Sequence, residues 1–295
     1  MIYDVSHVTT FEYAAKVDIS QHMLHLTPRS TRRQIVHRHS LVVTPSVTLT
    51  KDATDYFGNL TTYFTVEAPH DTLAITSTAR VEVDDDAAAP DPAATMPWDV
   101  LTKRLPAEHD ETALDAQEFM FESPFTGSTQ ARAYAEPSFP PGRPVLEGAI
   151  DLMRRIFADF KYEGGVTDIY TPVDRVLSER RGVCQDFAHL QIACMRSLRV
   201  PARYVSGYLM THPPEGKEKL VGSDASHAWL AVWTPGYGWV DLDPTNDMLP
   251  SNEHITVAWG RDYGDVSPVS GMVLGGGEQK VDVAVDVRPI APRAD

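Results

Sequence analysis

The chain has 295 residues, of which 42% are hydrophobic and 23% charged, and this ordinary globular usage excludes a disordered protein as the default. Its length is sufficient to bury a sizeable core in one large domain or two ordinary ones. The formal net charge of −15 repels phosphate backbones, so we expect no nucleic-acid partner.

Residues 1–83 have the pattern of several short β-strands. Apolar and aromatic residues alternate with other residues at a period of two over residues 3–13. The segments 35–43, 61–66 and 73–83 also suit strands, and prolines and a Phe-Gly-Asn turn separate them. Strands at this spacing predict a small N-terminal β-sandwich.

Residues 84–144 are predicted to be a linker followed by a helical segment. The run from Asp84 to Pro92 is rich in aspartate, alanine and proline, which is the composition of a linker. Its three consecutive aspartates lack the alternating ligands and the glycine of a calcium loop, so we expect no metal there. Residues 97–135 have a helical pattern, and a cluster of prolines then interrupts it.

Residues 145–270 are predicted to form a core that carries the chemistry. Apolar residues recur at helical spacing from Val145 to Phe160, and a second helix is expected to begin after Gly182, near Cys184. Three strands then follow, and we expect them over residues 202–210, 226–234 and 239–242. A Gly-Tyr-Gly sequence predicts a hairpin turn between the last two strands.

Residues 271–295 are predicted to be a C-terminal β-hairpin tail. Valines alternate from Val281 to Val287 after a run of three glycines. Taken together, the elements predict an α+β protein in which the N-terminal β domain precedes a core built from helices and an antiparallel sheet.

The two cysteines, Cys184 and Cys194, are too few for a disulfide framework. On one helix they would stand roughly 15 Å apart, whereas a disulfide needs Cα atoms within about 7 Å. Two free thiols fit a reducing compartment. The N-terminus lacks the pattern of a signal peptide, and no window approaches the roughly 20 apolar residues of a membrane helix. We therefore expect a cytoplasmic protein without a membrane partner.

Cys184 is the candidate nucleophile. It lies in the sequence Gly182-Val183-Cys184-Gln185-Asp186-Phe187-Ala188, where a helix is expected to begin. A helix N-terminus presents unpaired N–H groups and the positive end of the macrodipole, and it thereby favours the reactive thiolate. The same N–H groups can supply part of an oxyanion hole.

His227 and Asp243 are the candidate base and orienting residue. His227 lies near the start of one predicted strand, and Asp243 follows the end of the next. If these strands are antiparallel neighbours, the imidazole and the carboxylate meet at one end of the sheet. A helix packed on that sheet would bring Cys184 to His227, which is the arrangement of covalent catalysis. Taken singly, each of these residues has an ordinary structural explanation, since a lone free cysteine, for example, is usually a small buried apolar group. We adopt that explanation for Cys194.

These segments resemble the transglutaminase-like superfamily. The resemblance rests on Gly182 to Ala188, on His227-Ala228-Trp229, and on Gly238-Trp239 followed by Asp243-Pro244-Thr245. Two further segments, residues 55–59 and 260–266, are similar to bacterial members. The resemblance implies a papain-like α+β core with Cys184, His227 and Asp243 as a catalytic triad.

The resemblance also implies acyl chemistry at an amide through a thioester. We expect hydrolysis of a peptide or protein amide, without a cofactor or metal. One alternative is transglutaminase-type transfer of the acyl group to an amine, which would cross-link proteins. Another is an inactive binding module that retains the fold, although an intact set of Cys184, His227 and Asp243 argues against it.

Overall fold

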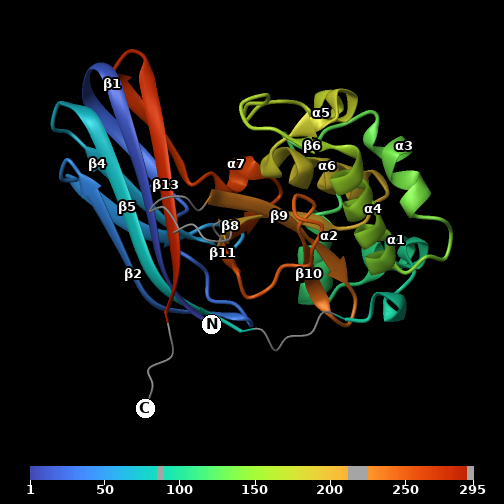
Figure 1. The fold of residues 1–295 in the computed structure, drawn as a ribbon. Coiled ribbons are helices and arrows are strands. Elements are labelled where there is room, and N and C mark those ends of the chain that lie inside the picture. Colours follow the sequence, from blue (N-terminus) through green and yellow to red (C-terminus); the bar gives the residue numbers. More distant parts are fainter. Residues whose placement is uncertain (85–89, 212–224, 291–295) are drawn as a thin grey trace, which may run out of the picture.

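The computed structural model describes residues 1–84, 90–211 and 225–290. One half of the molecule is an antiparallel sheet formed by the N-terminal and C-terminal strands, and the other half is a second sheet covered by helices (Figure 1). The predicted α+β class is confirmed, with Cys184 at the N-terminus of a helix that packs on an antiparallel sheet.

The first half is a seven-stranded antiparallel sheet. Its strands are β1 (Ile2–Leu24), β2 (Gln34–Thr44), β3 (Leu49–Thr54), β4 (Leu60–Val66), β5 (His70–Val83), β12 (Val269–Gly275) and β13 (Gln279–Ile290). The long strand β1 pairs with β4 and β5 in succession along one edge, and with β12 and β13 in succession along the other. Strands β2 and β3 pair in the same way with β5 and β4. The sheet therefore consists of four long paths, of which β1 is one continuous strand and each of the other three is divided into two strands.

The interruptions lie at the same level, beside the break in the β1 register between Glu12 and Val17. Residues on both sides of this break share one hydrophobic core, which includes Val17, Phe64 and Ile75. The small sandwich that we predicted is therefore a single curled sheet that folds over its own core (Figure 1).

The C-terminal strands differ from the predicted hairpin tail at residues 271–295. Among the described residues, β12 and β13 each pair with β1 and not with each other. Alternating valines indicate a strand but not its partner, and the long edge of β1 offers unpaired backbone groups to both segments. The C-terminal strands thus complete the N-terminal sheet. The residue limits of the predicted parts otherwise stay predictions.

The second sheet has the strand order β10-β9-β8-β11 and is antiparallel throughout. Its strands are β8 (Ala202–Leu209), β9 (Ala225–Thr234), β10 (Gly238–Leu242) and β11 (His254–Gly260). The three strands predicted from sequence correspond to β8, β9 and β10, and β11 was not predicted. Strand β11 forms one edge of this sheet.

Helices cover one face of the second sheet (Figure 1). They are α1 (Trp98–Arg104), α2 (Glu111–Glu118), α3 (Ala131–Ala135), α4 (Val145–Asp159), α5 (Val173–Glu179), α6 (Cys184–Ser197) and α7 (Tyr263–Val266). Three short 3₁₀ turns, Pro92–Ala94, Leu105–Ala107 and Glu136–Ser138, and the parallel pair β6 (Lys161–Tyr162) and β7 (Arg181–Gly182) connect them. Leu190 of α6 and Leu230 of β9 lie in one core with α4 residues such as Leu152. No helix in the described part of the chain is both long and apolar enough to cross a bilayer.

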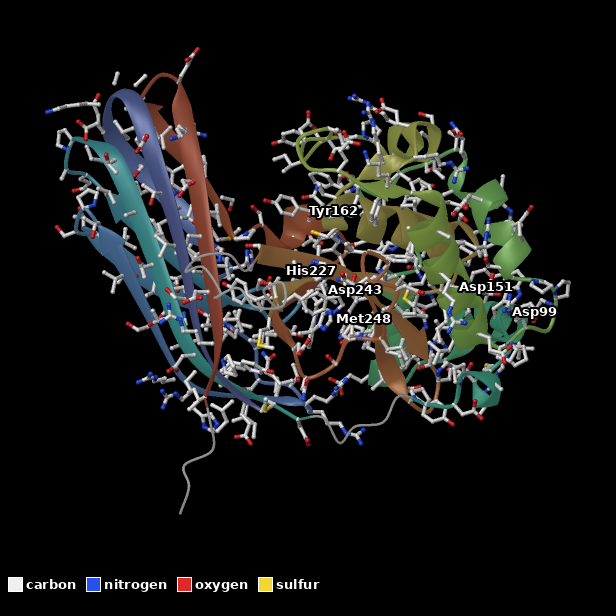
Figure 2. The ribbon with its side chains drawn as sticks, viewed as in Figure 1. Asp99, Asp151, Tyr162, His227, Asp243 and Met248 are labelled. Carbon is white, nitrogen blue, oxygen red and sulfur yellow. The ribbon has the colours of Figure 1, made fainter. Side chains whose placement is uncertain are left out.

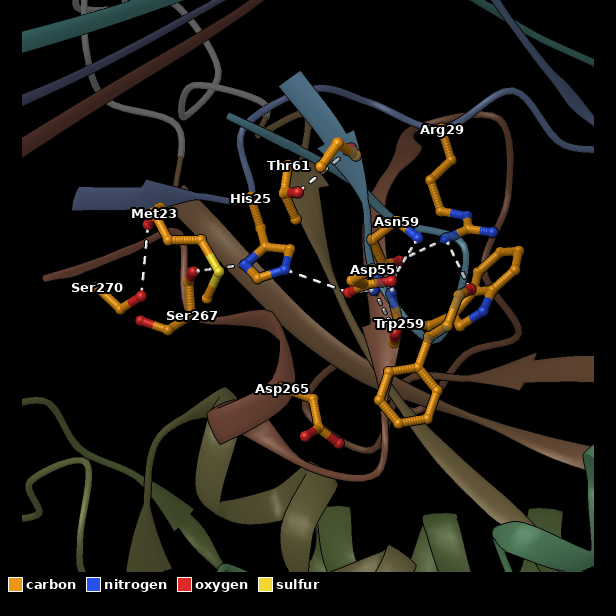
Figure 3. Close-up of polar contacts among 12 residues, drawn as sticks. Met23, His25, Arg29, Asp55, Asn59, Thr61, Trp259, Asp265, Ser267 and Ser270 are labelled. Carbon is orange, nitrogen blue, oxygen red and sulfur yellow. Dashed lines mark hydrogen bonds and ion pairs between the residues drawn. The ribbon is translucent and has the colours of Figure 1, made fainter. Parts of the chain in front are cut away.

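Two side-chain amides join the halves at the free edge of β11. Asn59, at the tip of the β3–β4 hairpin, donates to the carbonyl of Trp259 at 2.8 Å and accepts from its N–H at 2.9 Å (Figure 3). Gln34 makes the same pair of bonds with Thr256, at 2.7 and 2.8 Å. These amides replace the strand that the edge of β11 lacks, so buried backbone groups are satisfied and the halves are fixed together.

Candidate active site

Cys184 is the first residue of α6, and Asp186 fixes the start of that helix. One oxygen of the Asp186 carboxylate accepts hydrogen bonds from the N–H of Val183 and from the hydroxyl of Thr167, both at 2.7 Å. Burial raises the pKa of Asp186, and these hydrogen bonds oppose that rise. A Cβ at Gly182 would lie 2.8 Å from the Asp186 Cβ, so only glycine leaves room for this turn.

His227 and Asp243 are joined by the pairing of β9 with β10. The register Leu230–Leu242 places Asp243 just beyond the last pair, at the end of the sheet where His227 lies (Figure 2). His227 Nε2 is 2.7 Å from Asp243 Oδ2, and Asp243 is fully buried. Because Nε2 bonds to Asp243, Nδ1 is the ring nitrogen that remains for Cys184.

His227 is held in its protonated form. Burial lowers its pKa, but hydrogen bonding to Asp243 and Cys184, together with the negative charges of these two groups, outweighs burial and raises the pKa to about 10. Burial raises the pKa of Asp243, but hydrogen bonds from His227 and His254 outweigh it and leave that pKa well below its usual range. The imidazole of His227 therefore carries its proton at neutral pH, between the sulfur of Cys184 and the carboxylate of Asp243.

Three further groups hold Asp243. Asn246 Nδ2 donates to its Oδ2 at 2.7 Å, and the N–H of Thr245 donates to Oδ1 at 3.0 Å. His254 Nε2 lies 3.1 Å from Oδ2, and His254 is 3% exposed. The N–H of Ser251 points at His254 Nδ1 at 3.4 Å, so Nε2 is the nitrogen left to carry the proton that Asp243 accepts.

Sequence reasoning missed His254 and gave no role to Asn246. Asn246 stands three residues after Asp243 in the turn that follows β10, so its spacing could have indicated a side-chain contact. His254 begins β11, eleven residues after Asp243, and no local pattern links the two.

His227, Asp243 and His254 are also a set of groups that could hold a metal ion. One ligand atom of each lies within 4.8 Å of the others. Three ligands of this kind suit zinc in an open site. However, Asp243 Oδ2 already bonds to both imidazoles at 2.7 and 3.1 Å, and this satisfies all three groups as a hydrogen-bond network. The absence of a metal stays a prediction.

The two cysteines have different surroundings. Both are free, and Cys184 is partly buried whereas Cys194 is fully buried on the packed face of α6. Burial raises the pKa of the Cys194 thiol. Tyr162 stands beside Cys184, because β6 pairs Tyr162 with Gly182, and burial together with the charges of Cys184 and Asp186 raises the pKa of the Tyr162 hydroxyl.

The three residues chosen from sequence thus converge on one point, although they come from one helix and two strands. A thiol at a helix N-terminus, an imidazole next to it and a carboxylate behind the imidazole can attack a carbonyl, move a proton and stabilise the resulting oxyanion. The geometry suits covalent acyl chemistry.

Comparison with known proteins agrees with this geometry. The sequence model of the bacterial transglutaminase-like N-terminal region matches residues 3–82, and that of the transglutaminase-like superfamily matches residues 132–244. An uncharacterized protein of Mycobacterium tuberculosis (strain ATCC 25618 / H37Rv) is 42% identical over 300 residues, which cover 97% of this chain and 92% of the relative.

Two other similarities are more limited. The protein-glutamine gamma-glutamyltransferase of Pseudomonas aeruginosa is 35% identical over 78 residues, covering 26% of this chain and 12% of that protein. The solved structure of a candidate cysteine protease from Cytophaga hutchinsonii superposes with a TM-score of 0.77 at 22% identity, over 100% of this chain and 92% of that chain. At that identity the likeness concerns the fold alone.

Proposed function

Because this chain belongs to the transglutaminase-like superfamily, we propose that it is a cysteine-dependent enzyme that hydrolyses an amide bond of a peptide or protein. The observation that carries the proposal is the position of His227, which bonds to Asp243 at 2.7 Å and interacts with Cys184 through its other side. Nucleophile, base and orienting residue are thereby in contact.

The first half of the proposed reaction forms a thioester. The Cys184 sulfur attacks the carbonyl carbon of the amide while His227 holds the proton. The oxygen becomes an oxyanion, which the backbone N–H of Cys184 at the start of α6 can stabilise. The C–N bond then breaks, and the departing amine takes the proton from His227.

The second half releases the acid. His227 accepts a proton from a water molecule, and the oxygen of that water attacks the thioester carbon. The C–S bond breaks, the sulfur leaves as a thiolate, and this restores the pair of thiolate and protonated imidazole with which the cycle began. Throughout, the buried carboxylate of Asp243 holds the ring of His227 and stabilises its positive charge.

Transfer of the acyl group to an amine is the second candidate. It is supported by the local similarity to a protein-glutamine gamma-glutamyltransferase, which covers 26% of this chain. In this alternative a neutral primary amine replaces water in the second half, and the residues keep the same roles. The net charge of −15 attracts protonated amines but also stabilises that unreactive form, so charge alone favours neither acceptor.

We place the proposed enzyme in the cytoplasm, and its two free cysteines support a reducing compartment. Its proposed partners are peptides or proteins that present an amide, and neither nucleic acid nor membrane.

The test is a library of peptides and amides screened by mass spectrometry, in the presence and absence of a millimolar primary amine. Cys184→Ala serves as the inactive control and Cys194→Ala as the matched thiol control. We expect free acids to dominate with both acceptors present. A dominant amine adduct would show that the enzyme transfers the acyl group to an amine and does not mainly hydrolyse the thioester. Turnover that persists in Cys184→Ala would refute the assignment of Cys184 as the nucleophile.

A further inference from the structure

The second sheet has a cavity on the face that does not carry α6. The cavity has a volume of about 850 Å³, and side chains from all four strands line it. Its aromatic walls are Trp229, Trp239 and Trp259, with Tyr237 at the β9–β10 turn. Neither Cys184 nor His227 lines it. The cavity is therefore distinct from the point where the sulfur would attack.

Arg203 of β8 is a buried cation in this cavity. It is 8% exposed, and its guanidinium lies 4.5 Å from the ring centroid of Trp239 and 3.8 Å from that of Trp259. Its Nε has no hydrogen-bond partner, and Arg203 forms no hydrogen bond or ion pair with any residue that the structure describes. A guanidinium offers five N–H donors, so a buried guanidinium without hydrogen-bond partners is costly unless a ligand accepts from it.

The surrounding charges favour an anion. Three arginines, Arg32, Arg33 and Arg203, line the cavity with two carboxylates, Asp115 and Asp241, which gives a local excess of positive charge on a chain of net charge −15. A fourth arginine, Arg29, lies over the ring of Trp259, with its guanidinium carbon 3.6 Å from the ring centroid. Neither carboxylate lies close enough to Arg203 for an ion pair. Burial lowers the pKa of Arg203 to about 9, so it stays charged at neutral pH.

We propose that this cavity binds a small anion, a carboxylate or a phosphate, with Arg203 as the anchor and the indole rings as walls for the body of the ligand. An anion would meet the N–H groups of Arg203, which form no hydrogen bond with any residue that the structure describes and lie beside the rings of Trp239 and Trp259. The two oxygens of a planar carboxylate, or two of the oxygens of a phosphate, match the edge of a guanidinium with two parallel hydrogen bonds.

His254 connects this cavity to the triad. It lines the cavity and lies 3.1 Å from Asp243 Oδ2, so a ligand next to His254 would be two side chains away from His227. Binding itself needs no turnover, and its measurement is independent of the proposed hydrolysis.

The experiment uses the intrinsic fluorescence of the full-length chain, because three of its five tryptophans line the cavity. Benzoate and inorganic phosphate are titrated separately at constant ionic strength against chloride, and isothermal calorimetry checks the stoichiometry. We expect saturation at one site per chain for at least one anion. Saturation with benzoate alone would identify the ligand as an aromatic carboxylate, and saturation with phosphate alone would identify it as a phosphate. Saturation with both would show that the cavity recognises the negative charge.

Three variants test the anchor. Arg203→Met should weaken binding at least roughly tenfold, which corresponds to about 1.4 kcal/mol, and Arg33→Gln at the edge should weaken it less. Arg154→Met, an exposed arginine of α4 outside the cavity, is the matched control and should bind like the wild type. Thermal melting checks folding, and Arg33→Gln carries the test if Arg203→Met unfolds. Absence of saturation with both anions, or equal affinity in all variants, would overturn the proposal.

Discussion

The protonation of His227 depends on the charge of Asp243, and the substitution Asp243→Asn isolates that dependence. Asparagine has the shape of aspartate and can still accept a hydrogen bond from Nε2, but it carries no charge. An opposite charge at 4–6 Å changes a pKa by roughly 1–3 units, which is about 1.4–4 kcal/mol. The pKa of His227, about 10 in the wild type, should fall by that amount in Asp243→Asn. It should remain above the value that burial alone would give, because the contact with Cys184 persists.

The assay is a titration of the imidazole by ¹H–¹⁵N NMR, between neutral pH and pH 11. The chain has eleven histidines, and His227→Gln identifies the signal by its loss. Asp247→Asn is the matched control, because it removes the same charge from the same turn at an exposed position, where solvent screens it. If Asp243→Asn leaves the titration of His227 unchanged, or if Asp247→Asn shifts it equally, the carboxylate does not hold the proton on His227.

Further outcomes follow from the structure. Iodoacetamide should label Cys184 much faster than Cys194, which is fully buried, and peptide mapping measures the two rates. Cys184→Ala should lower turnover by a factor of roughly 10³–10⁶, whereas Cys194→Ala should change turnover little, and steady-state kinetics measure both variants. His254→Leu should lower kcat about tenfold with little change in KM, because Asp243 loses a hydrogen bond of about 1.5–3 kcal/mol. His254→Gln retains a donor and should recover part of the lost kcat. Equal losses of kcat in the two variants would contradict a positioning role for His254. Asn59→Ala leaves the N–H and carbonyl of Trp259 without partners and should lower the free energy of unfolding by about 2–4 kcal/mol in urea; an unchanged midpoint would show that the amide does not join the halves. Because folding raises the pKa of His227 from 6.5 to about 10, its stabilisation is complete below pH 6.5 and should be lost as pH rises through 10, so urea midpoints should fall over that window in the wild type and less in His227→Gln.

The sequence was sufficient to choose the three residues that the structure brings together, because each of them has a local signature. Gly182 and Asp186 mark the start of the helix that carries Cys184, and the tight turn between β9 and β10 brings the ends of two neighbouring strands together. Such signals depend on residues a few positions apart, so hydrophobic periodicity and turn residues indicate them directly.

The parts that sequence reasoning missed depend on contacts between distant segments. His254 reaches Asp243 only because β11 pairs with β8, which no local pattern specifies. The valines of β13 indicated a strand, but their pairing with β1 joins residues nearly a chain length apart. The cavity around Arg203 likewise needs residues from β8, β9, β10 and the segment before β2. Alternation specifies which face of a strand is buried, whereas the partner strand is selected by the whole fold.

Strand β11 gives the N-terminal half a structural role in the candidate active site. The outer edge of β11 is held by Gln34 and Asn59, and its first residue is His254, which bonds to Asp243. The match to the superfamily ends at residue 244, before β11 begins, and the N-terminal match ends at residue 82. A fragment restricted to the matched core would therefore lack both His254 and the strand that positions it. In this chain the curled N-terminal sheet does not merely precede the core, because it fixes the edge of the sheet on which the buried carboxylate of Asp243 depends.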